Sequence, residues 1–310
     1  MSLFLAALLL PSLFWDKGPD TANLLRQAKI THVLVPSSME ASWKSVSGIS
    51  VEAADPSQFV KVAAPGVTFR RRVASATRAP WVNSNGSKFI GQPDRRFYYD
   101  APGRAAALAA AEAFTYGVDA AIHTDEAGLA PLGDMLQFLG QQPQKKLPAL
   151  VNIGYIDDGS PESAEFMNLL VRRNLLFRVV KQPNPKLDTT VQLGMPQYPR
   201  SEAANPSLLA EKARAYLTDQ KRLLRIYGSE VVVGRLVGDA DSTRLYLLNY
   251  AEARAPIQGL RIRVKGIYND IRAAQCDTPD AHLLDTRADA TGTEFTLPEL
   301  KTFAVITLSR

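Results

Sequence analysis

The chain has 310 residues, of which 46% are apolar and 22% are charged, as in an ordinary globular protein. This length allows one large domain or a large and a small one, and the composition argues against extended disorder. The formal net charge is +5, but the Lys and Arg residues are dispersed and the longest basic run is Arg70–Arg72. We therefore expect a solvated basic surface and no nucleic acid partner.

The amino terminus carries an apolar run, Leu3–Leu10, followed by the strand-like residues Leu13–Trp15. The run has the length of a signal-peptide hydrophobic region and is too short to span a bilayer. It lacks a preceding Lys or Arg and a clean A-x-A cleavage site. We predict that residues 1–14 are a signal peptide or the first strand, and we favour a secreted or periplasmic protein. No other segment predicts a membrane span.

Short apolar runs alternate with helical patterns as far as Gly228. Such alternation over residues 15–227 predicts a (β/α)-barrel-like or partly open parallel α/β body. A doubly wound open sheet fits equally, as do barrel-like and flavodoxin-like pieces joined near Gln144, with the flavodoxin-like part over 145–227. Strands are expected at Leu13–Trp15, Thr31–Pro36, Ile49–Ala54, Asp119–His123, Ala149–Ile156, Leu175–Val180 and Thr189–Leu193. Helices are expected at Asp20–Ala28, Met39–Val46, Ala105–Tyr116, Leu129–Leu139, Ser160–Arg173 and Leu208–Leu224.

After Gly228 the pattern contains only strands separated by turns. Residues Leu260–Val264 (LRIRV) alternate cleanly, which is typical of a strand with one buried and one solvated face. We predict an antiparallel β-sandwich over 228–310. Its expected strands are Glu230–Val237, Arg244–Ala251, Leu260–Tyr268, Ala281–Thr286 and Thr302–Leu308.

Metal and disulfide chemistry have little support in the sequence. The single cysteine, Cys276, excludes an internal disulfide, and no CxxC pair or HExxH motif occurs. The three histidines, His32, His123 and His282, are far apart in sequence, which argues against a His/Cys zinc site. We expect neither a metal nor a cofactor.

Several carboxylates follow directly on predicted strands, where ligands bind in parallel α/β folds. Asp125 and Glu126 follow one such strand, and Asp157 follows the next. If the two strands are neighbours, their carboxylates face one crevice. Cleavage of a glycosidic bond requires one protonated and one ionised carboxyl group, so we predict Asp125 or Glu126 and Asp157 as catalytic residues.

Four further residues are candidates for sugar contacts. Trp81 offers an aromatic surface to the C–H face of a pyranose, and Asn83 and Asn85 offer hydrogen bonds to hydroxyl groups. Asp16 follows the first predicted strand and is a fourth candidate.

These residue types also have ordinary structural uses. Aspartate is typical of turns and helix N-caps, which is the simpler interpretation of Asp157 and Asp158, whereas for Asp125 and Glu126 the two interpretations are balanced. Asn85-Gly86 is a common turn. Trp81 is more often a core or cleft-wall residue, and a lone histidine such as His123 at a strand end is more often structural.

The sequence resembles known glycoside hydrolases in several segments. The run from Ala76 to Leu139, with ATRAPWVNSNG, FYYD, AALAAAEAFTYG and AAIHTD, resembles the later part of a (β/α) barrel of secreted bacterial glycoside hydrolases. The tail GTEFTLPELKTFAVITL is similar to their small C-terminal β-sandwich. Residues Val151–Val180 with Thr189–Leu193 resemble the flavodoxin-like insert of some β-galactosidase-like hydrolases. The resemblance implies an oligo- or polysaccharide as substrate or ligand.

The chain departs from these families at the catalytic positions. Families with the acid/base and the nucleophile on strands four and seven carry glutamates there. Here the fourth predicted strand end carries Asn83 and Asn85, and Leu175–Val180 leads into Lys181. We therefore predict a glycoside hydrolase whose catalytic pair has moved to Asp125 and Asp157. The alternative is a non-catalytic carbohydrate-binding or scaffold protein on a decayed hydrolase fold.

Overall fold

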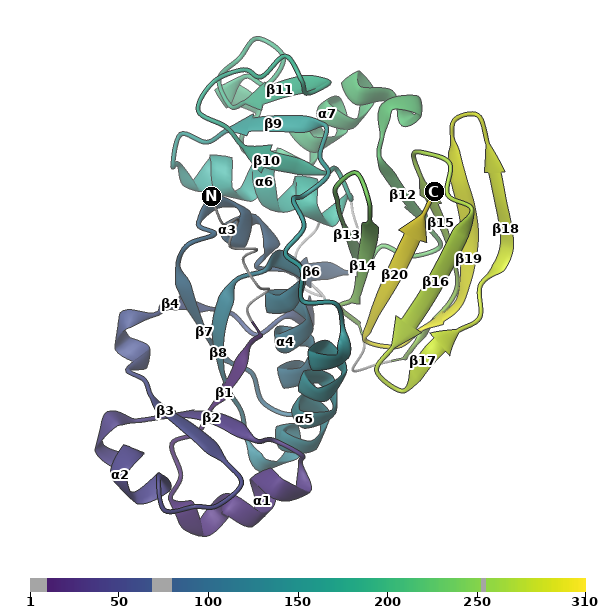
Figure 1. Ribbon diagram of the computed structural model, residues 1–310. Helices are drawn as coiled ribbons and strands as arrows, with labels where there is room; N and C mark the ends of the chain where they lie inside the picture. The colour runs from purple at the N-terminus through teal and green to yellow at the C-terminus, as the bar shows by residue number, and fades with distance from the viewer. Residues whose placement is uncertain (1–9, 69–79, 252–254) are drawn as a thin grey trace, which may run out of the picture. The chain divides into compact units, whose positions relative to one another are not determined.

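The computed structural model describes residues 10–68, 80–251 and 255–310 (Figure 1). The chain divides into two compact units, one containing Met1–Gly66 and Gln92–Lys146 and the other Val67–Gly91 and Leu147–Arg310. The basic run Arg70–Arg72 and most of the apolar run Leu3–Leu10 lie outside the described residues. Among the helices in the described part of the chain, none has the length and apolar character needed to cross a membrane.

The first unit is built on a six-stranded sheet in the order β3-β2-β1-β8-β7-β4. Every pair of neighbouring strands is parallel, which confirms the predicted parallel α/β body. The end of the segment 1–14 forms the inner strand β1. The strands are β1 (Ser12–Phe14), β2 (His32–Val35), β3 (Ser50–Ala53), β4 (Val60–Val62), β7 (Arg96–Asp100) and β8 (Asp119–His123).

The order of these strands is that of a barrel opened at one position. Strands that follow one another in this sheet are neighbours, except β3 and β4, which stand at its two ends. The first strand pairs with the last, through Phe14 and His123 among others, and this is the pairing that closes a (β/α) barrel. The body is therefore a partly open sheet with barrel-like strand order.

Helices follow most strands of this unit: α1 (Ala22–Gln27), α2 (Glu40–Trp43), α4 (Ala105–Tyr116) and α5 (Glu126–Gln141), with short 3₁₀ helices η1 (Pro19–Thr21), η2 (Ser37–Met39) and η3 (Pro56–Gln58). Helix α4 packs against both α5 and β8, beside the sheet in Figure 1. Its alanines allow close packing, and it ends at Gly117, whose φ of 64° is the left-handed conformation of a C-cap.

One buried hydrogen bond defines the two faces of the sheet. The Tyr99 hydroxyl on β7 donates to the Glu112 carboxylate on α4 at 2.7 Å. Tyr99 therefore lies on the helix-covered face, and because strand residues alternate, Tyr98 and Asp100 lie on the opposite face.

The second unit contains a three-stranded parallel sheet in the order β10-β9-β11. This sheet lies within the range for which the sequence predicts a flavodoxin-like part. Its strands are β9 (Ile153–Ile156), β10 (Phe177–Val179) and β11 (Thr189–Gln192); the helices are α3 (Gly86–Gly91), α6 (Pro161–Arg172), α7 (Pro206–Lys221) and η4 (Arg200–Glu202). Strands β5 (Gly66–Thr68) and β6 (Trp81–Asn83) form a separate two-stranded sheet.

Two antiparallel sheets follow, which confirms the predicted β-sandwich. The first is β12 (Leu224–Tyr227), β15 (Ile257–Val264), β19 (Gly292–Leu300) and β18 (Leu284–Asp289), in the order β12-β15-β19-β18. The second has the order β13-β14-β20-β16-β17, with β13 (Val232–Gly238), β14 (Thr243–Asn249), β20 (Phe303–Ser309), β16 (Asp270–Gln275) and β17 (Thr278–Ala281). Strand β12 precedes Gly228 and pairs with β15, so Leu224 lies in a strand and not in the predicted helix.

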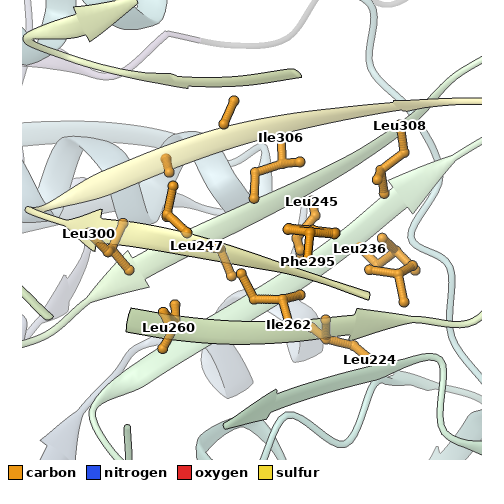
Figure 2. Close-up of a cluster of buried hydrophobic side chains, with 14 of the residues drawn as sticks. Leu224, Leu236, Leu245, Leu247, Leu260, Ile262, Phe295, Leu300, Ile306 and Leu308 are labelled. Carbon is orange, nitrogen blue, oxygen red and sulfur yellow. The ribbon is translucent and has the colours of Figure 1, made fainter. Parts of the chain in front are cut away.

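Apolar side chains from both sheets form the sandwich core shown in Figure 2. The alternation in LRIRV accounts for one side of it, because Leu260, Ile262 and Val264 are fully buried. The labelled residues of Figure 2 are Leu224, Leu236, Leu245, Leu247, Leu260, Ile262, Phe295, Leu300, Ile306 and Leu308.

Helix α5 packs so closely on the end of α1 that one of its residues must lack a side chain. A Cβ atom at Gly133 would lie 1.7 Å from the backbone oxygen of Ala28. We predict that Gly133→Ala lowers the free energy of unfolding by about 1–3 kcal/mol or more, because the backbone must shift. Urea denaturation measures this loss.

Gly140 provides a matched control in the same helix, since no atom lies within 4 Å of a Cβ built there. Gly140→Ala is expected to leave stability unchanged or raise it slightly, because alanine favours the helix. Equal stabilities for the two variants would contradict the close packing of α5 on Ala28.

Candidate functional site at the carboxyl edge of the parallel sheet

The carboxyl ends of β1, β7 and β8 bring polar residues together at one edge of the six-stranded sheet. In the parallel register, His123 on β8 pairs with Phe14 on β1 and with Asp100 on β7. Asp16 lies just beyond the end of β1. These three strand ends are hydrogen-bonded neighbours, so Asp16, Asp100 and His123 come together although they are far apart in sequence.

The imidazole of His123 lies between two carboxylates. Its Nδ1 is 3.1 Å from Oδ1 of Asp100, and its Nε2 is 3.5 Å from Oδ1 of Asp16. The imidazole ring stacks on the Tyr98 ring, with centroids 6.4 Å apart and an interplanar angle of 15°. The Asp100 side chain is 75% exposed and that of His123 is 27% exposed. Solvent therefore reaches the carboxylates more freely than it reaches the imidazole.

A small apolar cluster supports this group on the face opposite α4. Phe14, Leu34, Ala54 and Ala121 are buried there, with Tyr98 and Phe59 packed against them. Phe14 also meets the Tyr98 ring edge-on at 5.8 Å. The apolar cluster and the ring contacts fix the position of His123.

Tyr98 holds its proton strongly. Burial raises the pKa of its hydroxyl to about 12, and the negative charges of Asp100 and Asp16 act in the same direction. At neutral pH, Tyr98 is therefore an uncharged hydrogen-bond donor beside the two carboxylates.

Asp125 joins two loops at this edge of the sheet. Its Oδ1 accepts hydrogen bonds from the backbone N–H of Gly128 at 2.9 Å, as the N-cap of α5, and from that of Gly103 at 2.8 Å. Glu126 forms an exposed ion pair with Lys17 at 2.8 Å. The Asp125 carboxylate thus holds the loop after β7 against the start of α5.

Asp157 and Asp158 shape the turn before α6. Oδ1 of Asp157 accepts from the backbone N–H of Gly159 and from the Ser163 hydroxyl. Asp158 accepts from the backbone N–H of Ser160 and pairs with Arg200. These are the turn and cap contacts that the sequence also allows for them.

The strands before Asp125 and Asp157 are not neighbours, so the condition for a shared crevice is not met by sheet pairing. Strand β8 lies between β1 and β7, whereas β9 lies between β10 and β11 in another sheet of the other unit. The chain begins a second sheet at β9, beyond Gln144, where the sequence allows two separate pieces to join. Sheet pairing therefore does not bring Asp125 and Asp157 together.

The predicted sugar-contact residues Trp81, Asn83 and Asn85 also lie outside the six-stranded sheet. Trp81 and Asn83 belong to β6, which among the described residues pairs with β5 in a sheet of two strands, so they do not mark the end of a fourth strand of the six-stranded sheet. The guanidinium of Arg172 lies 3.9 Å from the Trp81 ring centroid. The backbone oxygen of Asn85 accepts from the N–H of Phe89 at the start of α3, so this segment opens a helix.

Sequence reasoning missed Asp100 and Tyr98 because it did not predict β7. The run RFYYD is rich in aromatic residues and ends in an aspartate, which is a signal for a buried strand with a polar end. No three His, Cys, Asp or Glu side chains within residues 10–68, 80–251 and 255–310 are arranged to hold a metal ion.

Comparison with known proteins identifies the class of fold. No family model and no curated protein matches the chain. The chain is similar to α-L-fucosidase isoenzyme 2 from Paenibacillus thiaminolyticus, with 9% identity and a TM-score of 0.54 over 87% of this chain and 70% of that chain. The chain therefore has a glycoside-hydrolase-like fold.

Two other solved structures match with lower TM-scores. A rhamnosidase from Novosphingobium sp. PP1Y is 10% identical, with a TM-score of 0.45 over 90% of this chain and 37% of its own. A catalytic mutant of the GH42 β-galactosidase Gan42B from G. stearothermophilus is 7% identical, with a TM-score of 0.41 over 85% of this chain and 64% of its own. The chain spans less than two thirds of either of these proteins.

The charge of Asp100 is expected to influence the ionisation of Tyr98. We predict that Asp100→Asn lowers the pKa of Tyr98 below its value of about 12, because a nearby negative charge no longer opposes the tyrosinate. Burial keeps the pKa above the ordinary value of 10.0. NMR titration of ring-labelled tyrosine measures it, with Tyr98→Phe to assign the signal. An unchanged pKa in Asp100→Asn, equal to that in the distant charge control Asp134→Asn, would contradict this electrostatic coupling.

Asp125 is expected to contribute to stability through its cap. We predict that Asp125→Ala lowers the free energy of unfolding by about 1–2 kcal/mol, because the N–H groups of Gly128 and Gly103 lose their acceptor. Urea denaturation measures the change. Asp134→Ala is the control in the same helix, since its exposed ion pair with Lys29 contributes little. A loss no larger than that of the control would exclude the capping role.

Proposed function

We propose that the chain binds a carbohydrate at the carboxyl edge of its six-stranded sheet and hydrolyses a glycosidic bond there. The observation that carries this proposal is the pair of solvent-accessible carboxylates, Asp16 and Asp100, on either side of His123. The glycoside-hydrolase-like fold supports it, as does the position of the pair at the strand ends where parallel α/β folds bind ligands.

The two carboxylates have different neighbours and would take different roles. We assign Asp100, the more exposed group, as the ionised carboxylate that attacks the anomeric carbon or activates water. We assign Asp16, whose Oδ1 lies 3.5 Å from Nε2 of His123, as the general acid that gives its proton to the leaving oxygen. The neutral Tyr98 hydroxyl donates a hydrogen bond to a sugar hydroxyl.

A catalytic role for Asp125, Glu126 and Asp157 stays a prediction. The hydrogen bonds of Asp125 and Asp157 to backbone and hydroxyl groups favour a positioning role for both, because those bonds occupy one oxygen of each carboxylate. Trp81, Asn83 and Asn85 likewise stay predicted sugar contacts.

A non-catalytic carbohydrate-binding protein is the second candidate. The ends of the central strands of the six-stranded sheet favour it, because β7 ends at Asp100 and β8 at His123 and neither ends at a glutamate. Binding on a glycan array without release of any sugar from the bound glycans would select this function over hydrolysis.

We predict that Asp16→Asn and Asp100→Asn each lower turnover of a hydrolysed glycoside by at least about 100-fold, because an amide neither attacks nor transfers a proton. The measurement is sugar release from a panel of aryl glycosides and oligosaccharides, with circular dichroism to check the fold. Asp94→Asn is the matched control, since Asp94 is exposed and precedes β7 at its opposite end. Full turnover in both site variants would remove Asp16 and Asp100 from the mechanism.

A further inference from the structure

The solvent face of the β12-β15-β19-β18 sheet carries a row of arginines. In the antiparallel register, Arg225 on β12 lies opposite Arg263 on β15. Arg263 lies opposite Glu294 on β19, which lies opposite Arg287 on β18. A second row pairs Tyr227 with Arg261. We call Arg225, Tyr227, Arg261, Arg263 and Arg287 the arginine face.

The arginine face points away from the sandwich core. Its residues alternate along β12 and β15 with Leu224, Leu260, Ile262 and Val264, which are fully buried between the sheets. The side chains of Arg261 and Arg287 are 51% and 67% exposed, and Tyr227 is 43% exposed. Solvent therefore reaches Arg261, Arg287 and Tyr227, whereas the side chain of Arg263 is 11% exposed.

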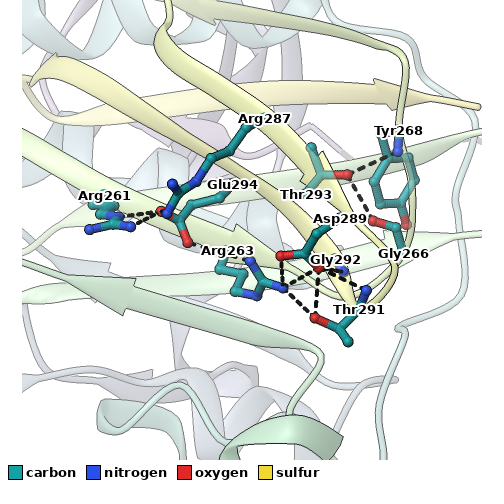
Figure 3. A network of polar contacts seen from close by, with 10 residues as sticks. All are labelled: Arg261, Arg263, Gly266, Tyr268, Arg287, Asp289, Thr291, Gly292, Thr293 and Glu294. Atoms are coloured by element: carbon teal, nitrogen blue, oxygen red, sulfur yellow. Dashed lines mark hydrogen bonds and ion pairs between the residues drawn. The ribbon is translucent and has the colours of Figure 1, made fainter.

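Ion pairs hold three of the arginines in place (Figure 3). Glu294 accepts from Arg261, from Arg263 at 3.5 Å and from Arg287 at 3.1 Å. Arg263 also binds both carboxylate oxygens of Asp289, at 2.7 and 2.8 Å. The hydrogen bond from Arg263, with those from Thr291, holds the pKa of Asp289 well below its usual range. The carboxylates of Glu294 and Asp289 are thus both bound by arginines of the face.

The charges on this face do not balance. The face carries four arginines, and two carboxylates, Glu294 and Asp289, pair with three of them. A third carboxylate, Asp285, contacts Thr296 and no arginine of the face. Arg225 forms no ion pair with any carboxylate in the described part of the chain, and it lies directly opposite another arginine. Asp289 and Glu294 offset the charge of Arg263, so Arg225 is the arginine of the face whose charge is left for an outside anion.

We propose that the arginine face binds an acidic polysaccharide, a chain of sugars with carboxylates at regular intervals. Arginine presents a planar fork that matches a carboxylate with two hydrogen bonds. Arg225 and Arg263 lie on neighbouring strands, about 4.8 Å apart, whereas Arg287 lies two strands beyond Arg263 with Glu294 between them, so an acidic chain that crosses the sheet meets arginines on three of its four strands. Tyr227 supplies an aromatic surface beside Arg261 for a sugar ring.

A polysaccharide fits this face better than a nucleic acid. The arginine face carries one exposed aromatic side chain, Tyr227, whereas proteins that bind single strands use several aromatic stacking platforms. The glycoside-hydrolase-like fold of the chain also favours a glycan. This binding does not depend on hydrolysis at the parallel sheet, so the two proposals stand or fall separately.

The test measures equilibrium binding of the full chain to polygalacturonate at low salt, with its methyl ester as the neutral counterpart. Polygalacturonate is expected to bind at least about tenfold more tightly than the ester, since each charge-assisted pair adds affinity. The double variant Arg225→Ala/Arg287→Ala is expected to lose at least about tenfold in affinity. Arg287→Ala alone, on the exposed edge strand, is expected to lose about threefold and provides a test if the double variant does not fold.

Arg272→Ala is the matched control. Arg272 lies on β16 of the other sheet, its side chain is 77% exposed, and it pairs with Asp270. The Arg272→Ala substitution removes the same charge from the sandwich and is expected to leave the binding of polygalacturonate unchanged. Equal binding of polygalacturonate and its ester, or equal losses in Arg287→Ala and Arg272→Ala, would overturn the proposal. Tighter binding of single-stranded DNA than of polygalacturonate would reassign the face to nucleic acid.

Discussion

The parallel pairing of β1 with β8 is the interaction on which the first unit depends. It joins the first strand of the sheet to the last and places the end of β1 beside His123. Without this pairing, the strands β1, β2 and β3 and the strands β4, β7 and β8 would be two separate groups. The pairing also brings Asp16 to the imidazole that contacts Asp100. The barrel-like order and the candidate site therefore have one structural cause.

Most of the helices and strands could be predicted from local patterns in the sequence. Periodic helices such as Ala105–Tyr116 and the alternation in Leu260–Val264 are properties of neighbouring residues, and both appear in the structure. Neighbour relations between parallel strands are not local, since crossover segments separate them. The sequence therefore left open whether the strands before Asp125 and Asp157 are adjacent, and in the structure β9 begins a different sheet. Because strand β7 was not predicted, the contact between His123 and Asp100 was not predicted either.

The same distinction applies to the candidate site. A histidine at a strand end has no evident role when it is considered alone, and the structure gives His123 two carboxylates and a stacked tyrosine. Asp125 shows the converse. Its sequence position suits both a catalytic residue and an N-cap. Its hydrogen bond from the N–H of Gly128 is the local cap contact, whereas that from Gly103 is a contact that only the folded chain creates. Sequence alone identified the polar strand ends, whereas tertiary contacts distinguish their uses.

Opening a barrel between two strands creates two sheet edges, and exposed edges invite pairing with other chains. In the described sheet these edges belong to β3 and β4. Both strands are short, and each carries a charged residue in its middle, Glu52 or Lys61. Short, charged edges are a means by which soluble sheets avoid aggregation. A closed barrel has no sheet edges and needs no such protection. In this open sheet, the short and charged edge strands β3 and β4 protect against self-association instead.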